Sequence, residues 1–216
     1  MTLVNFIWYL AHIPPIISGS GFIMGLIFYK KLPGFYRSLV VFLGLMLLVE
    51  RIMFYIANST GSNYVVQPYY ALIELVFFVF LYKKYMLNKN YTLLLILEIT
   101  SIAYLIYEII YYSLITTTAE QFQSYAKPLD NFIIILLSLC YLYENTNSFD
   151  ASRFKYLWFN IIVLAYCSLS TFIFLPFNFM INQSTNLIFV FWLINIIALV
   201  VFYGFITYKI WRAARN

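Results

Sequence analysis

The chain has 216 residues, of which 64% are hydrophobic and 10% are charged, and its formal net charge is +5. Its mean hydropathy is +0.86, whereas soluble domains usually contain about 25% charged residues. So little polar surface excludes a water-soluble globular protein. The apolar runs extend for about twenty residues, which is the length that an α-helix needs to cross a bilayer. The sequence therefore predicts an all-α membrane protein.

Seven apolar runs have roughly the length of a membrane span, and we expect them to form one domain over residues 1–216. They cover approximately residues 5–29, 38–57, 68–86, 91–113, 129–143, 156–179 and 186–210. Pro14 and Pro15 are expected to kink or loosen the first span. Gly19, Gly21 and Gly25 should allow a neighbouring helix to approach it closely. The predicted fold is a seven-transmembrane-helix bundle.

Lysine and arginine are concentrated on one side of this bundle, which predicts its orientation. If seven spans alternate, eleven of the 13 Lys and Arg residues lie in segments that face the same side. They are Lys30, Lys31, Arg37, Lys83, Lys84, Lys89, Arg153, Lys155, Lys209, Arg212 and Arg215. Lys127 lies in a loop on the opposite side, and Arg51 lies within the second span. Because cytoplasmic loops are enriched in Lys and Arg, we expect the amino terminus outside and the carboxyl terminus in the cytoplasm.

Several functions are disfavoured by what the sequence lacks. No basic stripe on a soluble face is present, so nucleic-acid binding is not expected. Cys140 and Cys167 lie in different spans and His12 is the single histidine, a poor set for a metal, so no metal site and no cofactor are expected. The first lysine is Lys30, so the charged start of a cleavable signal is missing and the first span should remain. These absences favour a protein without catalytic activity, although a carboxylate-based intramembrane hydrolase would leave little motif.

Ionisable residues and asparagines inside the predicted spans indicate where a site could lie. A charged side chain near the bilayer centre costs roughly 2.5–3.5 kcal/mol on insertion scales, and it usually has a partner and often a function. By their position along the spans, most of these residues fall in the outer half of the membrane. They are His12, Arg51, Glu74, Glu108, Asp130 and Asn131, with Asn195 near the middle of the last span. Glu98, in the inner half, is the exception.

Helical spacing places aromatic side chains beside some of these polar groups. Tyr70 and Glu74 are four residues apart and share a helix face, as do Tyr104 and Glu108. One interpretation is a polar ligand pocket that opens to the outer side. Its candidate lining is Arg51, Glu74, Glu108, Tyr70, Tyr104, Asn131, Trp192, Asn195 and His12.

The other interpretation is an internal ion-pair network that only fixes how the helices pack. Its members would be Arg51 with Glu74 or Glu50. Because consecutive residues of a helix point about 100° apart, the pair between Arg51 and Glu74 is favoured over the pair between neighbours. His12 likewise has two interpretations, a hydrogen-bonded packing residue or a proton relay, and packing is the commoner role of a lone histidine.

The second and third spans carry a recognisable pattern. It comprises Glu50 and Asn58, then Tyr69-Tyr70-Ala71-Leu72-Ile73-Glu74, Phe77-Phe78 and Tyr82-Lys83. This pattern, with its Phe-, Tyr-, Ile- and Asn-rich composition, resembles small seven-helix proteins found in Bacteroidota, some of which are encoded near sensor kinases. The resemblance implies that Tyr70 and Glu74 are features of that family, and it implies no established activity.

Three functions are compatible with the sequence. The first is a receptor-like or sensory protein of a bacterial cytoplasmic membrane, which binds a small or lipidic ligand and signals through a partner such as a sensor kinase. The inner loops 30–37 and 83–89 would then dock the partner, or would simply contact anionic lipid headgroups. The second is a small solute or proton-coupled transporter, in which Glu98 continues a polar route across the membrane. The third is a structural membrane subunit without a ligand.

Overall fold

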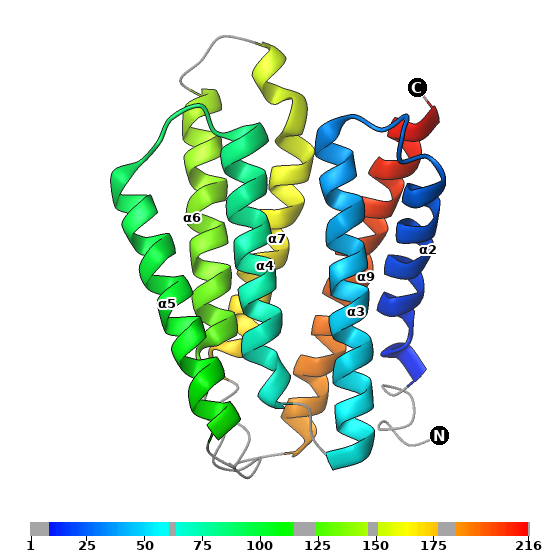
Figure 1. The fold of residues 1–216 in the computed structure, drawn as a ribbon, viewed down its shortest axis with the longest axis vertical. Helices are drawn as coiled ribbons and strands as arrows, with labels where there is room; N and C mark the ends of the chain where they lie inside the picture. The colour runs from blue at the N-terminus through cyan, green and yellow to red at the C-terminus, as the bar shows by residue number, and fades with distance from the viewer. Residues whose placement is uncertain (1–8, 61–63, 115–123, 147–150, 177–184, 216) are drawn as a thin grey trace. The chain divides into compact units, whose positions relative to one another are not determined.

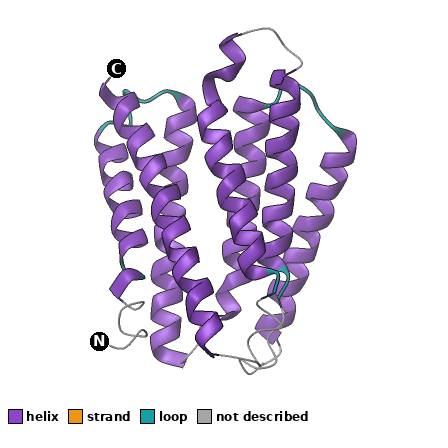
Figure 2. Cartoon of the chain, turned by 180° about the vertical axis from the view of Figure 1, so that it is seen from behind, coloured by secondary structure: helices purple, strands orange, loops and turns teal. Residues whose placement is uncertain are grey.

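The computed structural model describes residues 9–60, 64–114, 124–146, 151–176 and 185–215, and these residues form helices and turns without any strand (Figure 2). Five helical segments are long and apolar enough to cross a membrane. They are Gly34–Ser59, Thr92–Leu114, Ala126–Thr146, Phe154–Phe174 and Phe189–Arg215. Ile13–Ile27 is a shorter apolar helix. The chain is thus helical and multi-pass in character, as expected, whereas the number of seven spans and the sides of the termini stay predictions.

Each predicted span corresponds to a helix of the structure (Figure 1). The longer helices are α2 (Ile13–Ile27), α3 (Gly34–Thr60), α4 (Gln67–Leu81), α5 (Thr92–Leu114), α6 (Ala126–Thr146), α7 (Leu157–Phe174) and α9 (Thr185–Arg215). Two short 3-10 helices, η1 (Tyr64–Val66) and η4 (Ala151–Tyr156), precede α4 and α7. A π-helix, η2 (Tyr82–Met86), continues α4 directly, so the two together cover the predicted third span.

Proline marks several helix ends. Pro14 and Pro15 lie in the first turn of α2, and Pro68 lies in the first turn of α4. The first turn tolerates proline because its backbone N–H groups have no acceptor within the helix. The two prolines expected to kink or loosen the first span therefore begin α2, after a turn at residues 11 and 12. Pro128 lies in the first turn of α6, and Pro176 follows the end of α7.

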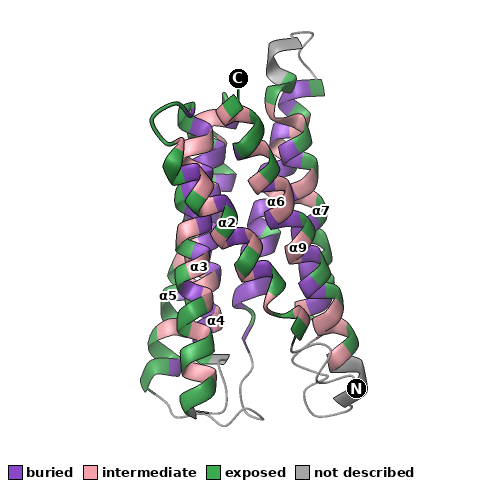
Figure 3. Cartoon of the chain, turned by 90° about the vertical axis from the view of Figure 1, so that its right-hand side faces the viewer, coloured by how far each residue is buried: buried purple, intermediate pink, exposed green. Residues whose placement is uncertain are grey.

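The helices belong to two compact units. Unit 1 contains residues 1–63 and 179–216, and unit 2 contains residues 64–178. In unit 1, α2 packs against both α3 and α9. Much of the apolar surface of the helices is exposed (Figure 3), as lipid-facing helices require. Ile23, Ile27, Leu48 and Val201 are examples in this unit.

Two of the three glycines predicted to allow a close approach, Gly21 and Gly25, form close contacts in unit 1, whereas a Cβ atom on Gly19 would make only an ordinary contact with Leu47, at 3.7 Å. A Cβ atom built on Gly21 would lie 2.2 Å from Oγ1 of Thr207 in α9, and one on Gly25 would lie 2.3 Å from Cγ2 of Val40 in α3. The Thr207 hydroxyl also donates a hydrogen bond to the carbonyl of Ile17, at 3.4 Å. Because glycine has no side chain, the backbone of α2 can approach α3 and α9 closely at these positions, which is a common way to pack helices in membranes.

Helix α6 is the central helix of unit 2. It packs against α4, α5 and α7, and more than half of its most apolar stretch is buried. A helix that is surrounded on three sides can bury polar side chains only if they find partners on the neighbouring helices. The polar residues of α6 are therefore the natural place to look for a site.

Candidate functional site

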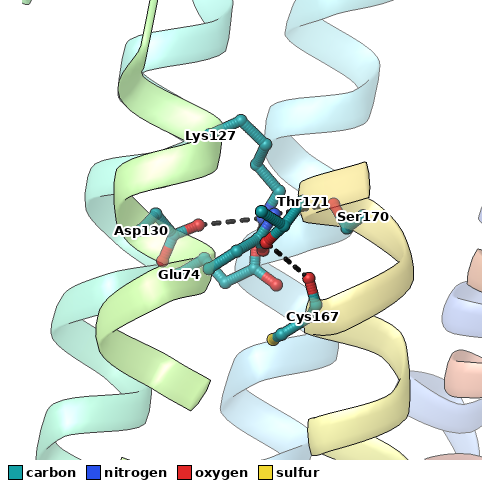
Figure 4. A network of polar contacts seen from close by, with 7 residues as sticks. Glu74, Lys127, Asp130, Cys167, Ser170 and Thr171 are labelled. Atoms are coloured by element: carbon teal, nitrogen blue, oxygen red, sulfur yellow. Dashed lines mark hydrogen bonds and ion pairs between the residues drawn. The ribbon is translucent and has the colours of Figure 1, made fainter. Parts of the chain in front are cut away.

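A buried cluster of three charged residues lies where the first turn of α6 faces the middle of α4 (Figure 4). Lys127 of α6 forms ion pairs with Glu74 of α4 and with Asp130 of α6, the second at 2.8 Å between Nζ and Oδ2. The side chain of Lys127 is 3% exposed and those of Glu74 and Asp130 are fully buried. We call these three residues the Lys127 cluster.

The local sequence explains how α6 supplies two of the three charges. Lys127 and Asp130 are three residues apart, so both lie on the face of α6 that is turned toward its neighbours. The ammonium group of Lys127 also lies 5.1 Å from the ring centre of Tyr70 and 5.8 Å from that of Tyr166. Both are within the range of cation–π attraction. Lys127 is thus held by α4, α6 and α7 together.

The Lys127 cluster contains more carboxyl groups than ammonium groups. One ammonium group faces two carboxyl groups, each of which contacts it through one oxygen. The remaining oxygens, Oε1 of Glu74 and Oδ1 of Asp130, are buried and have no hydrogen-bond partner among the described residues. The neighbouring Asn131 donates from Nδ2 to Ser170 of α7, at 2.9 Å, while its Oδ1 is also buried without a partner. A buried acceptor without a hydrogen bond lowers the stability of the folded chain, so these oxygens indicate that a partner binds there.

A second buried polar group lies farther along the same helices. The hydroxyl of Tyr82 donates to Oδ1 of Asn160, at 2.6 Å, and lies 2.6 Å from the hydroxyl of Ser138. Asn160 donates in turn to the carbonyl of Ser138, at 3.2 Å. These contacts join η2, α6 and α7, and we call the three residues the Tyr82 network. Its sequence signal was weak, because Ser and Asn on one stripe of an apolar helix do not reveal their partner.

An apolar layer separates the Lys127 cluster from the Tyr82 network. Phe78 of α4 lies midway between Glu74 and Tyr82, four residues from each, and it is fully buried. On α6, Ile134 lies between Asn131 and Ser138 and is also fully buried. On α7, Val163 and Cys167 lie between Asn160 and Ser170, and both are fully buried. Each of the three helices thus places an apolar or weakly polar side chain at the level between the two polar groups.

Replacing Tyr82 with phenylalanine tests the Tyr82 network. The substitution removes one hydroxyl and leaves Oδ1 of Asn160 and the Ser138 hydroxyl with fewer partners in a dry interior. We expect a loss of about 1–3 kcal/mol in the free energy of unfolding, measured by chemical denaturation in detergent micelles. Tyr143→Phe is the matched control, since that side chain is 63% exposed. Equal stability of the two variants would contradict the buried network.

Glu108 anchors the start of α6. Its Oε1 accepts hydrogen bonds from the Tyr104 hydroxyl, at 2.5 Å, and from the backbone N–H of Tyr125, at 3.0 Å. Its Oε2 accepts one from the Ser124 hydroxyl, at 2.5 Å, and Ser124 Oγ itself accepts from the N–H of Ala126. The face shared by Tyr104 and Glu108 is thus a direct contact. A Glu108 carboxyl with both oxygens engaged holds α5 and α6 together.

Two more glutamates bind groups at the opposite ends of these helices. Glu98 of α5 forms an ion pair with Lys83 of η2. Glu144 of α6 accepts hydrogen bonds from the backbone N–H groups of Asn88 and Lys89, at 2.9 and 3.1 Å, and so fixes the connection between η2 and α5. Glu98, which was expected to be the exception, is therefore paired locally through Oε2, while its Oε1 is buried without a partner in the described part of the chain.

The remaining candidate residues belong to unit 1. Arg51 is exposed on α3, and Glu50 forms a side-chain hydrogen bond with Tyr203 of α9 while its Oε2 has no partner. His12 packs edge to face on Phe54, at 6.1 Å between ring centres. On α9, Asn195 is buried and Trp192 is half-buried. Because these residues and Glu74 lie in different units, the shared pocket and the pair between Arg51 and Glu74 stay predictions.

Lys127 was not among the predicted site residues. We expected it in a loop, because the fifth span was predicted to begin at residue 129. Helix α6 begins at Ala126, which puts Lys127 inside the first turn and buries it. The available signal was its spacing of three residues from Asp130, with Pro128 between them as a typical first-turn residue.

Comparison of the chain with protein-family models, with curated proteins and with solved structures finds no match. The resemblance to small seven-helix proteins of Bacteroidota therefore stays a prediction. Within the described part of the chain, no group of three His, Cys, Asp or Glu side chains is placed to hold a metal ion.

Proposed function

We propose that the chain is a receptor-like or sensory protein of a bacterial cytoplasmic membrane, with its amino terminus outside. In this orientation the Lys127 cluster lies in the outer half of the membrane and the Tyr82 network in the inner half. The ligand is a small or lipidic molecule that is bound in the outer half. The chain signals through a separate partner, such as a sensor kinase, at its cytoplasmic side.

The observation that carries this proposal is that the carboxyl groups at the two ends of unit 2 differ in how well their charges are balanced. At the cytoplasmic end Glu98 has one lysine, Lys83, for one carboxyl group, although its Oε1 is buried without a partner, and Glu144 binds the backbone of the next loop. In the outer half the Lys127 cluster has two carboxyl groups for one ammonium group, and one oxygen of each carboxyl group has no partner among the described residues. Intramembrane charges that are not merely paired off are commonly functional. A site confined to one half of the membrane suits detection of a ligand better than its passage.

A small solute or proton-coupled transporter is the alternative. It is favoured by the Tyr82 network, which continues the buried polar groups of α6 and α7 into the inner half. Against it stands the layer formed by Phe78, Ile134 and Val163, each fully buried. A transporter would have to open this layer, whereas a receptor would keep it closed. A structural subunit without a ligand would use all of these contacts for packing alone.

Ligand-dependent thermal stability tests the proposal. The purified chain would be melted with and without a panel of metabolites and lipids, beside Glu74→Gln and Arg51→Gln. Glu74→Gln keeps one carboxylate, Asp130, for the single ammonium of Lys127, so we expect it to fold. We expect at least one compound to raise the melting temperature of the native chain and to have a smaller effect on both variants. Tyr107→Phe, on the exposed face of α5, is the control and should respond like the native chain.

The same compound separates the three functions. In proteoliposomes a receptor's ligand should bind and not accumulate in the lumen, whereas accumulation would establish the transporter. If no compound shifts the native chain and both charge variants are severely destabilised, the charges serve packing and the receptor proposal is wrong.

A further inference from the structure

The Lys127 cluster has two defects that one small ligand could correct together. The first is its charge, since one ammonium faces two carboxyl groups in a fully buried place. The second is the pair of unpartnered acceptors, Oε1 of Glu74 and Oδ1 of Asp130. An uncompensated charge in an apolar interior costs several kcal/mol even after the protein relaxes. Such a cluster is unstable unless something binds to it.

The two carboxyl groups are close enough to share a ligand. Both contact the same nitrogen, Nζ of Lys127, so the two carboxyl groups lie next to each other. If one carboxyl is protonated, its O–H can donate to an oxygen of the other. One proton would then cancel the extra negative charge and supply a missing hydrogen-bond donor.

The other titratable groups around the cluster do not remove the need for this proton. From α4 the cluster faces Tyr70, and from α7 it faces Tyr166 and Cys167, none of which brings a positive charge. The charged residues of α5 are both glutamates and are engaged elsewhere, Glu98 with Lys83 and Glu108 with the start of α6. Figure 4 shows Cys167 and Ser170 of α7 beside the three charged side chains.

We propose that the Lys127 cluster is a proton-binding site, in which Glu74 and Asp130 together hold one proton opposite the charged Lys127. The proton comes from water and returns to it, by formation and breakage of a single O–H bond on a carboxyl group. A bound metal cation explains the cluster less well, because Na⁺ or Ca²⁺ needs several oxygen ligands. A proton needs only the carboxyl oxygen that carries it and one oxygen that accepts its hydrogen bond. This inference goes beyond the proposed function, since it holds whether or not an external ligand binds nearby.

Infrared spectroscopy of the full chain in lipid vesicles tests for the bound proton. A protonated carboxyl has a carbonyl stretch that an ionised carboxylate lacks. Glu50 is half-buried and also has an oxygen without a partner, so it could contribute a carboxyl band of its own. The measurement is therefore made in a Glu50→Gln background. We expect the band of one protonated carboxyl at neutral pH. It should be absent from Glu74→Gln and from Asp130→Asn, because either variant leaves one carboxylate for one ammonium.

Glu98→Gln and Glu108→Gln are the matched controls, since both remove a buried glutamate of α5 outside the cluster. They should keep the band. A spectrum of the Glu50→Gln chain without the band, or a band that survives the addition of either Glu74→Gln or Asp130→Asn, would overturn the proposal.

The dependence of stability on pH gives a second, independent readout. If the folded chain binds a proton that the unfolded chain has released, the free energy of unfolding falls as pH rises. In the same Glu50→Gln background the chain should therefore lose stability across the titration with a slope that corresponds to one proton, and adding Asp130→Asn should remove that slope. Replacing sodium by choline in the buffer should change neither result. A stability that follows sodium rather than pH would overturn the proposal in favour of a bound cation.

Discussion

Replacing Lys127 with methionine is expected to be among the most damaging single substitutions in this chain. It leaves Glu74 and Asp130 buried against each other without a positive charge. Removing one partner of a buried ion pair typically costs about 3–5 kcal/mol, because the charge left behind is neither solvated nor paired. Chemical denaturation in mixed detergent micelles would measure the loss, with helix content and tertiary fluorescence as separate probes of unfolding.

The destabilisation should be reversed by removing the remaining charges. In the triple variant Lys127→Met, Glu74→Gln, Asp130→Asn, no charge is left in the cluster, so we expect most of the lost stability to return. Lys155→Met is the control for the loss of a lysine, because Lys155 is exposed, and it should change stability little. If Lys127→Met is as stable as the native chain, the ammonium is not buried between the two carboxyl groups.

Substituting alanine for Gly21 is the second change expected to have a large effect, in the other unit. The added Cβ would lie 2.2 Å from Oγ1 of Thr207 and 2.8 Å from Cδ1 of Leu43, so either these two side chains must change conformation or α2 must move away from α9 and α3. Overpacking of a close interface costs about 1–3 kcal/mol. Thermal unfolding of the purified variant, in the same detergent as the native chain, would measure the effect.

Gly204→Ala provides the opposite expectation from the same substitution. A Cβ on Gly204 meets nothing within 4 Å, although this glycine lies on α9, which also carries Thr207. Alanine is the better helix former by about 0.5–1 kcal/mol, so Gly204→Ala should leave stability unchanged or raise it. A similar loss of stability in both variants would mean that the glycines matter for the helix itself rather than for the contact of α2 with its neighbours.

The helices of this chain were predictable because a bilayer imposes one strong rule on the sequence. Apolar runs of sufficient length must form helices, since no other backbone conformation satisfies its own hydrogen bonds in lipid. Each predicted span accordingly has a helix, and the close contacts at Gly21 and Gly25 followed from their small size. The ends were less certain, and the start of α6 at Ala126, three residues earlier than expected, had the largest consequence.

The partners of the charged residues could not be predicted in the same way. Spacing along one helix identified Tyr104 beside Glu108, and a hydrogen bond joins them. A partner on another helix depends on which helices are neighbours and how each is rotated, and the hydrophobic pattern of a span that is apolar on all sides does not specify either. For this reason Glu74 was assigned to Arg51, while its ion pair in unit 2 is with Lys127.

Unit 1 is discontinuous in the chain, and this affects the order in which the protein can be assembled in the membrane. Helices α2 and α3 are synthesised first, but α9, against which α2 packs through Gly21, is synthesised last. Unit 2 is a continuous segment and can complete its contacts before α9 leaves the ribosome. Until α9 is inserted, α2 and α3 therefore lie in the bilayer with the surface that contacts α9 uncovered. A nascent chain stalled before α9 should accordingly be recognised by membrane quality control through α2 and α3, while unit 2 within it is already protected from proteolysis.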